Sequence, residues 1–308
     1  MTVLLYCFTV LIWGTTWIAI SVQSEYTSPP VAIFWRMGIS ALLLGAILLA
    51  TRKMKWLSAR DHAFCLLQGA TVFGINFLCF YTAAKYVNSG LECLIFSTSI
   101  FFNAINSWIF LKQRPSMNFF PAATLGVSGI FLLFSRDLLA ADVDTNFLKG
   151  IGLCVLGTFA FSIGNLIGTR NQLNRLCVFT TTTYAMGYAA LIMLALSLAF
   201  KLDIYPSLES AFLISLAHLA IFGSVVAFTV YFSLIGRIGS ANAAYTTLLF
   251  PLVALTISTI YEGFEWTTAS MAGAILIFSG VMVLFTKPGA LVPRFQILSQ
   301  LFSARKTS

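Results

Sequence analysis

Charged side chains are scarce in this sequence. Asp, Glu, Lys and Arg make up 9% of its 308 residues, against about 25% in an ordinary soluble domain. Hydrophobic residues account for 59%, and the mean hydropathy is +0.91. A water-soluble fold of this composition would expose apolar surface that it could not cover. The composition therefore predicts an all-α integral membrane protein that crosses the bilayer many times.

Signature motifs of enzymes and ATP-driven pumps are also lacking. The sequence holds no GxxxxGK[ST], no HExxH and no GxSxG. It has only two histidines, and none of its six cysteines forms a CxxC pair. We therefore expect a protein that is not an enzyme and that has no cofactor and no metal site.

Ten apolar stretches are each long enough to cross a bilayer as a helix, which takes about 20 residues. Breakers or charged residues separate them, as in TRKMKWLSARDH and SRDLLAADVDTN. The first stretch lacks a basic leader and a small-residue cleavage site, so we expect it to be retained. The predicted spans are 3–22, 31–51, 63–83, 88–111, 117–135, 148–169, 178–200, 210–232, 239–260 and 267–286.

The basic residues predict the orientation of these spans. If the N-terminus is cytoplasmic, the inner loops and tail hold thirteen Lys and Arg residues and the outer loops hold four, Lys85, Arg136, Lys149 and Lys201. Positive charge gathers on the cytoplasmic side of membrane proteins. We therefore expect a multi-pass protein of the cell (inner) membrane with both termini in the cytoplasm. Because the net charge of +8 lies mostly in short loops, we expect no nucleic-acid partner.

The two halves of the chain resemble each other at a constant offset. A shift of 151 residues places GVSGIFLLF (126–134) on IFSGVMVLF (277–285) and Ser89 on Ser240. Each half holds five spans, so the second copy would enter the membrane from the opposite side. The sequence thus predicts two inverted five-helix repeats, 3–135 and 148–286, followed by a cytoplasmic tail, 287–308. Inverted repeats are typical of secondary transporters, which bind substrate near the bilayer midplane.

Three motifs carry a resemblance to a known family: IWGTTWIAI in the first span, YTAAKYVNSGLECLIFSTS across the third and fourth, and GSANAAYTTLLFPLVAL entering the ninth. The sequence resembles the drug/metabolite transporter superfamily and, more narrowly, its EamA-like bacterial members, over about residues 3–286. The resemblance implies a ten-helix bundle with a central cavity that exports amino acids or related metabolites. Where members often have a proline and a following acid in the fourth span, this chain has Ile100 and Gln113.

Polar residues in the fourth span recur at helical spacing: Glu92, Ser99, Asn103 and Asn106, with Phe96 between them. On one continuous helix they would share a face. Such a stripe in a membrane span faces the bundle interior or a water-filled cavity. The equivalent positions of the ninth span are almost apolar. Two alternatives stay open: the stripe lines a substrate path, or it forms hydrogen bonds between helices.

Arg36 in the second span and Glu92 are predicted at similar depths below the outer surface. They either form a structural salt bridge, with Arg36 reaching toward the headgroups, or bind an amphoteric substrate. In the second case Arg36 would bind a carboxylate, and Glu92 would bind an ammonium group or a proton. His218 lies near mid-depth in the eighth span. It is either a second proton-coupling candidate or a neutral histidine bonded to a neighbouring helix.

The remaining candidates for substrate binding are polar or aromatic residues within spans; each also has an ordinary packing role as its alternative. Pro251 is predicted to act as a hinge, because it frees a backbone carbonyl in the ninth span. The other candidates are Trp13, Thr16, Trp17, Asn76, Tyr81, Asn165, Tyr184 and Tyr245.

The expected partners are a small-molecule substrate and the lipid bilayer. Small residues four apart in the fifth and tenth spans, Ala122 with Gly126 and Ala269 with Gly273, pack helices closely and allow a homodimer through these spans. Two further functions stay open: efflux of hydrophobic or cationic drugs, or a role as a non-transporting membrane scaffold or sensor. Nucleotide-sugar transport is a third option within the same superfamily.

Overall fold

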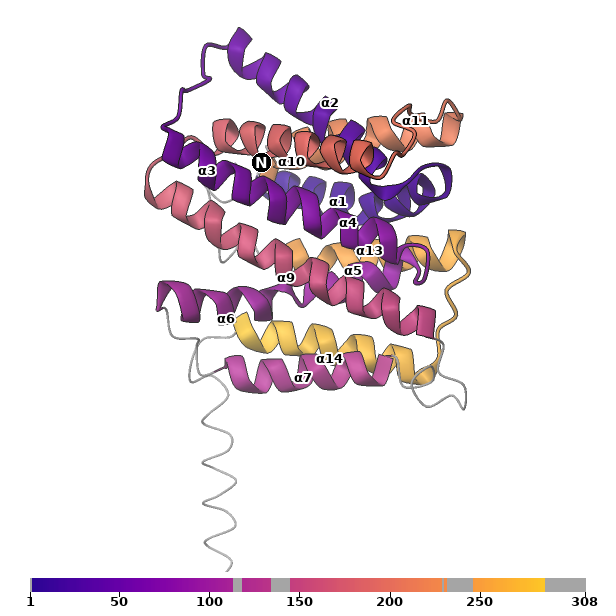
Figure 1. The fold of residues 1–308 in the computed structure, drawn as a ribbon. Coiled ribbons are helices and arrows are strands. Elements are labelled where there is room, and N and C mark those ends of the chain that lie inside the picture. The colour runs from indigo at the N-terminus through magenta and orange to yellow at the C-terminus, as the bar shows by residue number, and fades with distance from the viewer. Residues whose placement is uncertain (1, 113–117, 134–144, 229, 232–245, 286–308) are drawn as a thin grey trace, which may run out of the picture.

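The computed structural model describes residues 2–112, 118–133, 145–228, 230–231 and 246–285. Every regular element in these residues is helical. The helices lie side by side in one bundle, with α2 and α10 at one end of the row and α7 and α14 at the other (Figure 1). The predicted tail 287–308 and Tyr245 lie outside the described residues.

The first half of the chain forms eight helical elements, and several begin at a recognisable cap. Pro29 and Pro30 occupy the first positions of α2, where a missing N–H costs nothing. The Ser58 hydroxyl accepts from the Asp61 amide at the start of α3, and Asn88 does the same for Leu91 at the start of α5. The elements are α1 (Thr2–Tyr26), α2 (Pro29–Ala50), α3 (Ala59–Gln68), η1 (Gly69–Ile75), α4 (Asn76–Ala83), α5 (Ser89–Ser97), α6 (Ser99–Leu111) and α7 (Phe119–Leu133).

The second half holds six helical elements among the residues that the structure describes. Its elements are α9 (Thr145–Leu173), α10 (Val178–Ala199), α11 (Ser210–Ala217), η2 (His218–Val226), α13 (Thr246–Tyr261) and α14 (Thr268–Phe285). The segments η1 and η2 are π-helical. An offset of 150 places residues 69–75 on 219–225, inside η2, so both halves carry the same irregularity at the same place.

Among the described residues, six helical stretches are long and apolar enough to cross a membrane: Cys7–Tyr26, Pro29–Ala50, Ala59–Ala83, Ser89–Phe110, Thr145–Leu173 and Val178–Ala199. Four shorter apolar helices, Phe119–Gly129, Ser210–Val226, Leu249–Tyr261 and Thr268–Gly280, lie where the fifth, eighth, ninth and tenth spans are predicted. The all-helical multi-span prediction is therefore confirmed, and the count of ten spans stays a prediction.

The fourth predicted span is not one continuous helix. It divides at Thr98 into α5 and α6. The hydroxyl groups of Ser97 and Thr98 donate to the carbonyl groups of Leu94 and Ile95, each at 2.6 Å. Such local bonds compete with the regular helix pattern. Thr98 itself keeps a right-handed helical backbone, with φ −72° and ψ −4°, so the interruption is confined to one turn.

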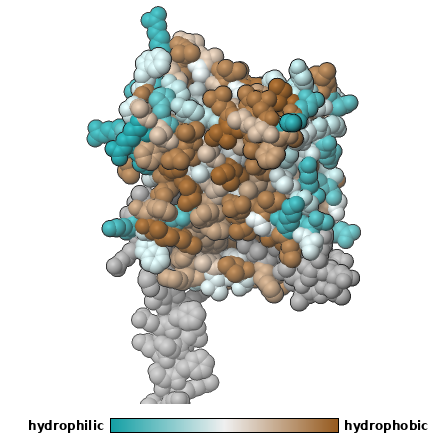
Figure 2. Space-filling model, viewed as in Figure 1, coloured by the Kyte–Doolittle hydropathy of each residue, from teal (hydrophilic) through white to brown (hydrophobic). Residues whose placement is uncertain are grey.

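The surface carries a broad apolar region. Figure 2 shows hydrophobic residues across the middle of the visible face and hydrophilic residues along two opposite sides. Large side chains such as Leu42, Leu49 and Phe131 are exposed on the helices. A lipid environment accommodates these side chains, because hydrocarbon tails replace the apolar contacts that water cannot provide.

A close helix contact joins α7 and α14, the fifth and tenth predicted spans. A Cβ atom on Gly129 would lie 2.7 Å from the carbonyl oxygen of Gly273, and one on Gly280 would lie 2.6 Å from that of Ala122. Adding 151 to 129 gives 280, and adding 151 to 122 gives 273. The same contact is thus made twice, with the roles of the helices exchanged. These small residues pack within one chain, and the homodimer stays a prediction.

Candidate functional site

A cavity of about 330 Å³ lies between the helices of both halves. One end is open, because Thr169 and Gln172 near the end of α9 line it and are exposed. The other end is closed, and there the lining residues Arg36, Phe80 and Phe250 are buried. The cavity has the size and the mixed apolar and polar lining of a small-molecule site, and it is reached from one side of the bundle.

Eight of the fourteen substrate-binding candidates line this cavity. Four come from the first two helices and one from α4, while α6 and α9 supply the rest. They are Trp13, Thr16, Trp17, Arg36, Asn76, Ser99, Asn103 and Asn165. Tyr245 lies outside the described residues, and the other five lie elsewhere.

Aromatic rings form much of the wall. The Trp17 ring lies 5.0 Å from Phe80 and 5.4 Å from Phe96, centroid to centroid. The Phe96 ring lies 4.6 Å from Phe161 and 6.1 Å from Phe250. These edge-on and tilted contacts hold the rings in place, so the wall presents apolar surface to an occupant.

Arg36 is buried, with 2% of its surface exposed. Its Nε donates to the Ser224 hydroxyl at 3.4 Å, and its Nη1 donates to the Tyr81 hydroxyl at 3.5 Å. The guanidinium carbon lies 4.1 Å above the Phe77 ring centroid, a cation–π contact. The Tyr81 hydroxyl in turn donates to Gln23 Oε1 at 2.7 Å. Arg36 is thus held by neutral groups.

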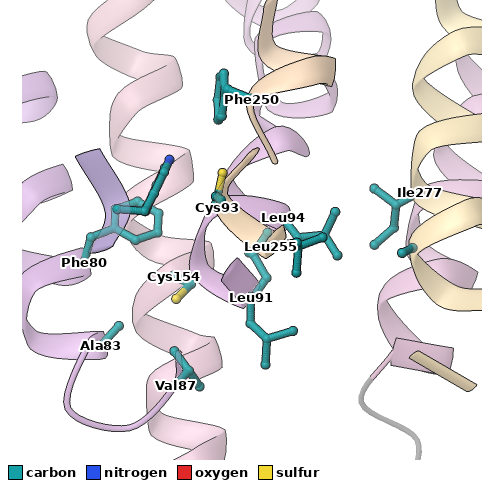
Figure 3. Close-up of a cluster of buried hydrophobic side chains, with 14 of the residues drawn as sticks. Phe80, Ala83, Val87, Leu91, Cys93, Leu94, Cys154, Phe250, Leu255 and Ile277 are labelled. Carbon is teal, nitrogen blue, oxygen red and sulfur yellow. The ribbon is translucent and has the colours of Figure 1, made fainter. Parts of the chain in front are cut away.

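Glu92 does not line the cavity and is not paired with Arg36. It is fully buried, and neither of its carboxyl oxygens has a hydrogen-bond partner among the described residues. Apolar side chains crowd the surroundings of α5: Figure 3 shows Leu91, Cys93 and Leu94 together with Cys154 of α9 and Leu255 of α13. A buried carboxyl group without a partner is costly. The predicted structural salt bridge between Arg36 and Glu92 is therefore absent among the described residues.

The other candidates outside the cavity have partners. Asn106 Nδ2 donates to the Ser162 hydroxyl at 2.7 Å. His218 Nε2 lies 3.0 Å from the Thr15 hydroxyl, whose own proton goes to a backbone carbonyl. Tyr184 packs against His62 at 4.5 Å between centroids. Pro251 lies inside α13, and its role as a hinge stays a prediction.

Several further residues line the cavity without being among the predicted site residues. Phe73, Phe77, Phe80, Phe161, Phe228 and Phe250 escaped notice because phenylalanine occurs 29 times and is ordinary in lipid-facing helices. Thr181 and Thr182 line the open end, and a detectable signal existed there. Four consecutive threonines, 180–183, are unusual inside an apolar span.

We expect the two fourth-span asparagines to differ in mutational effect. Asn103 faces the cavity and makes no side-chain hydrogen bond among described residues, so Asn103→Ala should change the KM for transport with little effect on stability. Asn106→Ala leaves the buried Ser162 hydroxyl without its donor, which lowers the free energy of unfolding by about 1–3 kcal/mol. Thermal unfolding of purified protein, combined with transport kinetics, measures both. Equal changes in KM for the two variants would contradict the assignment.

A bundle of apolar helices around a one-sided central cavity is the architecture of a membrane carrier. The chain belongs to the EamA-like transporter family, whose family model matches residues 1–135 and 148–286. It is therefore a multi-pass membrane transporter of that family.

Relatives resemble the chain over most of its length. The uncharacterized transporter YoaV of Bacillus subtilis (strain 168) is 24% identical over 89% of this chain and 92% of its own. The uncharacterized inner membrane transporter YedA of Escherichia coli (strain K12) is 27% identical over 90% and 88%. A probable amino-acid metabolite efflux pump of Salmonella typhimurium (strain LT2) is 22% identical over 89% and 91%. One solved crystal structure shares the fold, with a TM-score of 0.65 at 14% identity over 92% and 96% of the two chains.

Proposed function

We propose that this protein is a secondary transporter that exports amino acids or related small metabolites through the central cavity. The observation that carries the proposal is the path from an exposed mouth at Gln172 to a single buried cation, Arg36. A relative named as a probable amino-acid metabolite efflux pump supports this substrate class. Cationic drugs fit the site less well, because they would meet the charge of Arg36.

Two features support an arrangement of two inverted five-helix repeats around the cavity. The α7–α14 contact is made twice at positions related by 151 residues. The π-helical segments recur at positions related by 150 residues. Under this arrangement ten spans place both termini on the cytoplasmic side, and the mouth of the cavity faces the cytoplasm. A cytoplasmic mouth is where an exported substrate enters.

The transport function is tested with purified protein in liposomes. The vesicles are loaded with labelled amino acids, the corresponding deaminated carboxylic acids, nucleosides or cationic dyes, and release is followed with and without a pH gradient. We expect release of amino acids or related metabolites and no release of dyes. A response to the gradient would support Glu92 or His218 as a proton-coupling residue. Release of dyes alone would favour drug efflux, and no release of any compound would favour a non-transporting role.

The orientation of the cavity has its own prediction. Gln172→Cys places a thiol at the mouth, and Tyr205→Cys places one in the exposed loop between α10 and α11, both in a variant without Cys7 and Cys177. A membrane-impermeant maleimide should label the Gln172→Cys protein only in inside-out vesicles and the Tyr205→Cys protein only in spheroplasts. The reverse pattern would place the mouth outside and refute cytoplasmic termini.

A further inference from the structure

The charge inside the cavity has one sign. Arg36 is the only charged side chain among its described lining residues. Within the described part of the chain both hydrogen bonds of its guanidinium group are long, at 3.4 and 3.5 Å, and both go to neutral oxygen atoms. Its Nη2 atom has no hydrogen-bond partner in the described part of the chain. Among described residues the one ion pair is Arg170 with Asp61, a partly exposed contact between α9 and α3.

A buried guanidinium held only by neutral groups is well suited to an incoming anion. Charge-assisted hydrogen bonds to a carboxylate are shorter and stronger than bonds to a hydroxyl group. The planar fork of donors matches the two oxygens of a carboxylate. An anion on Arg36 would therefore improve on the long contacts that Ser224 and Tyr81 provide.

A positively charged group has no comparable partner in this cavity. Glu92, the carboxyl group that the sequence suggests for binding an ammonium group, is enclosed in the apolar packing around α5 and does not line the cavity. The neutral acceptor Asn76 Oδ1 is buried and without a partner. The other acceptors of the lining are also uncharged amide and hydroxyl oxygen atoms, such as those of Asn103 and Asn165, and they offset the dehydration of an ammonium group far less than a carboxylate does. An α-amino acid would also hold its ammonium group next to Arg36.

Aromatic rings form the largest apolar part of the cavity lining. Rings from α1, α4, α5, α9 and α13 form a wall, with Trp17 and Phe96 in contact at its centre. Flat aromatic faces pack best against another ring or a planar apolar body. The polar end at Arg36 and the aromatic wall thus define a ligand with one anionic end and one apolar end.

We infer that the substrate is an aromatic monocarboxylate that carries no ammonium group. This inference rests on the proposed function, because it names the class of metabolite for the same cavity. Arg36 binds the carboxylate, and the aromatic wall around Trp17 and Phe96 binds the ring. Within the class of amino-acid-related metabolites, it selects deaminated acids over the amino acids themselves.

Three compounds that share a phenyl group but differ in charge test the predicted preference for a carboxylate without an ammonium group on the unaltered protein. Purified protein in nanodiscs is incubated with labelled 3-phenylpropionate, and unlabelled phenylalanine or phenethylamine is added as competitor. We expect 3-phenylpropionate to bind at least 10-fold more tightly than phenylalanine, and phenethylamine not to compete. Phenylalanine binding as tightly as 3-phenylpropionate, or no binding of 3-phenylpropionate, overturns the inference.

Two variants locate the effect. Arg36→Gln should remove the preference for 3-phenylpropionate over phenethylamine, and Arg36→Lys should keep its direction because the charge is retained. Unchanged selectivity in a folded Arg36→Gln protein overturns the role of Arg36.

Transport measurements separate the transporter proposal from the monocarboxylate inference. Binding of 3-phenylpropionate without any flux in liposomes contradicts the transporter proposal alone, whereas flux of phenylalanine without binding of 3-phenylpropionate contradicts the monocarboxylate alone.

Discussion

A single methyl group at Gly280 is expected to destabilise this protein more than most substitutions elsewhere. Its Cβ atom would lie 2.6 Å from the carbonyl oxygen of Ala122 and 3.0 Å from the amide nitrogen of Gly126. Backbone atoms cannot rotate away as side-chain atoms do, so α7 and α14 must separate. We expect Gly280→Ala to lower the free energy of unfolding by about 1–3 kcal/mol or more.

Two companion variants make the experiment decisive. Gly129→Ala should have an effect of similar size, because Gly129 makes the equivalent contact with Gly273. Gly152→Ala is the matched control, since nothing lies within 4 Å of an added Cβ there. Alanine is the better helix former, so this control should gain about 0.5–1 kcal/mol. Thermal unfolding in mild detergent measures all three, and three changes of the same sign would contradict the α7–α14 packing.

Replacing Glu92 by leucine should make the protein more heat-stable and inactive in transport. Neither carboxyl oxygen of Glu92 has a partner among the described residues, and the side chain is fully buried. Removing an unsatisfied buried polar group recovers about 1–3 kcal/mol. Under the proposed role in proton coupling, the same change abolishes transport driven by a pH gradient. Unfolding curves and proteoliposome assays measure the two effects.

Glu262 provides the contrasting carboxyl group at the same end of α5. Its Oε2 accepts from the Ser89 amide at 3.0 Å and from the Ser89 hydroxyl at 2.7 Å. Glu262→Ala removes these charge-assisted bonds and should lower stability by about 1.5–3 kcal/mol. A Glu92→Leu protein that is less stable than the native protein, and that transports normally, would refute the interpretation of Glu92 as an unpaired functional group.

Hydropathy predicts the helices of this fold well, because burial in lipid demands a long apolar run at each of them. It does not predict the break at Thr98. Two adjacent hydroxyl groups there bond to nearby carbonyls, but similar bonds occur at Thr158 and Ser197 in unbroken helices. The π-helical segments are equally invisible to hydropathy, since one additional residue in a turn changes no composition.

The site was predictable where a residue is unusual for a membrane span. Arg36 stands out by its charge, and Trp13 and Trp17 by their size within the first span. The angles of an ideal helix place Glu92 and Asn106 on the same face as Ser99 and Asn103. In the structure Glu92 of α5 lies outside the cavity lining, and within α6 the Asn106 side chain bonds to Ser162 of α9. Such partners come from distant parts of the chain and leave no trace in local spacing.

The paired π-helical segments give the third and eighth spans a property that a straight α-helix lacks. A π turn contains one more residue than the regular pattern requires. If that surplus residue passes to the neighbouring turn, the residues between its old and new positions rotate by about 100° about the helix axis, while the helix on either side keeps its register. Asn76 and Phe77 stand just beyond η1. A shift of this kind past Asn76 and Phe77 would rotate the part of the cavity wall beside Arg36, and η2 allows the same rotation in the other half.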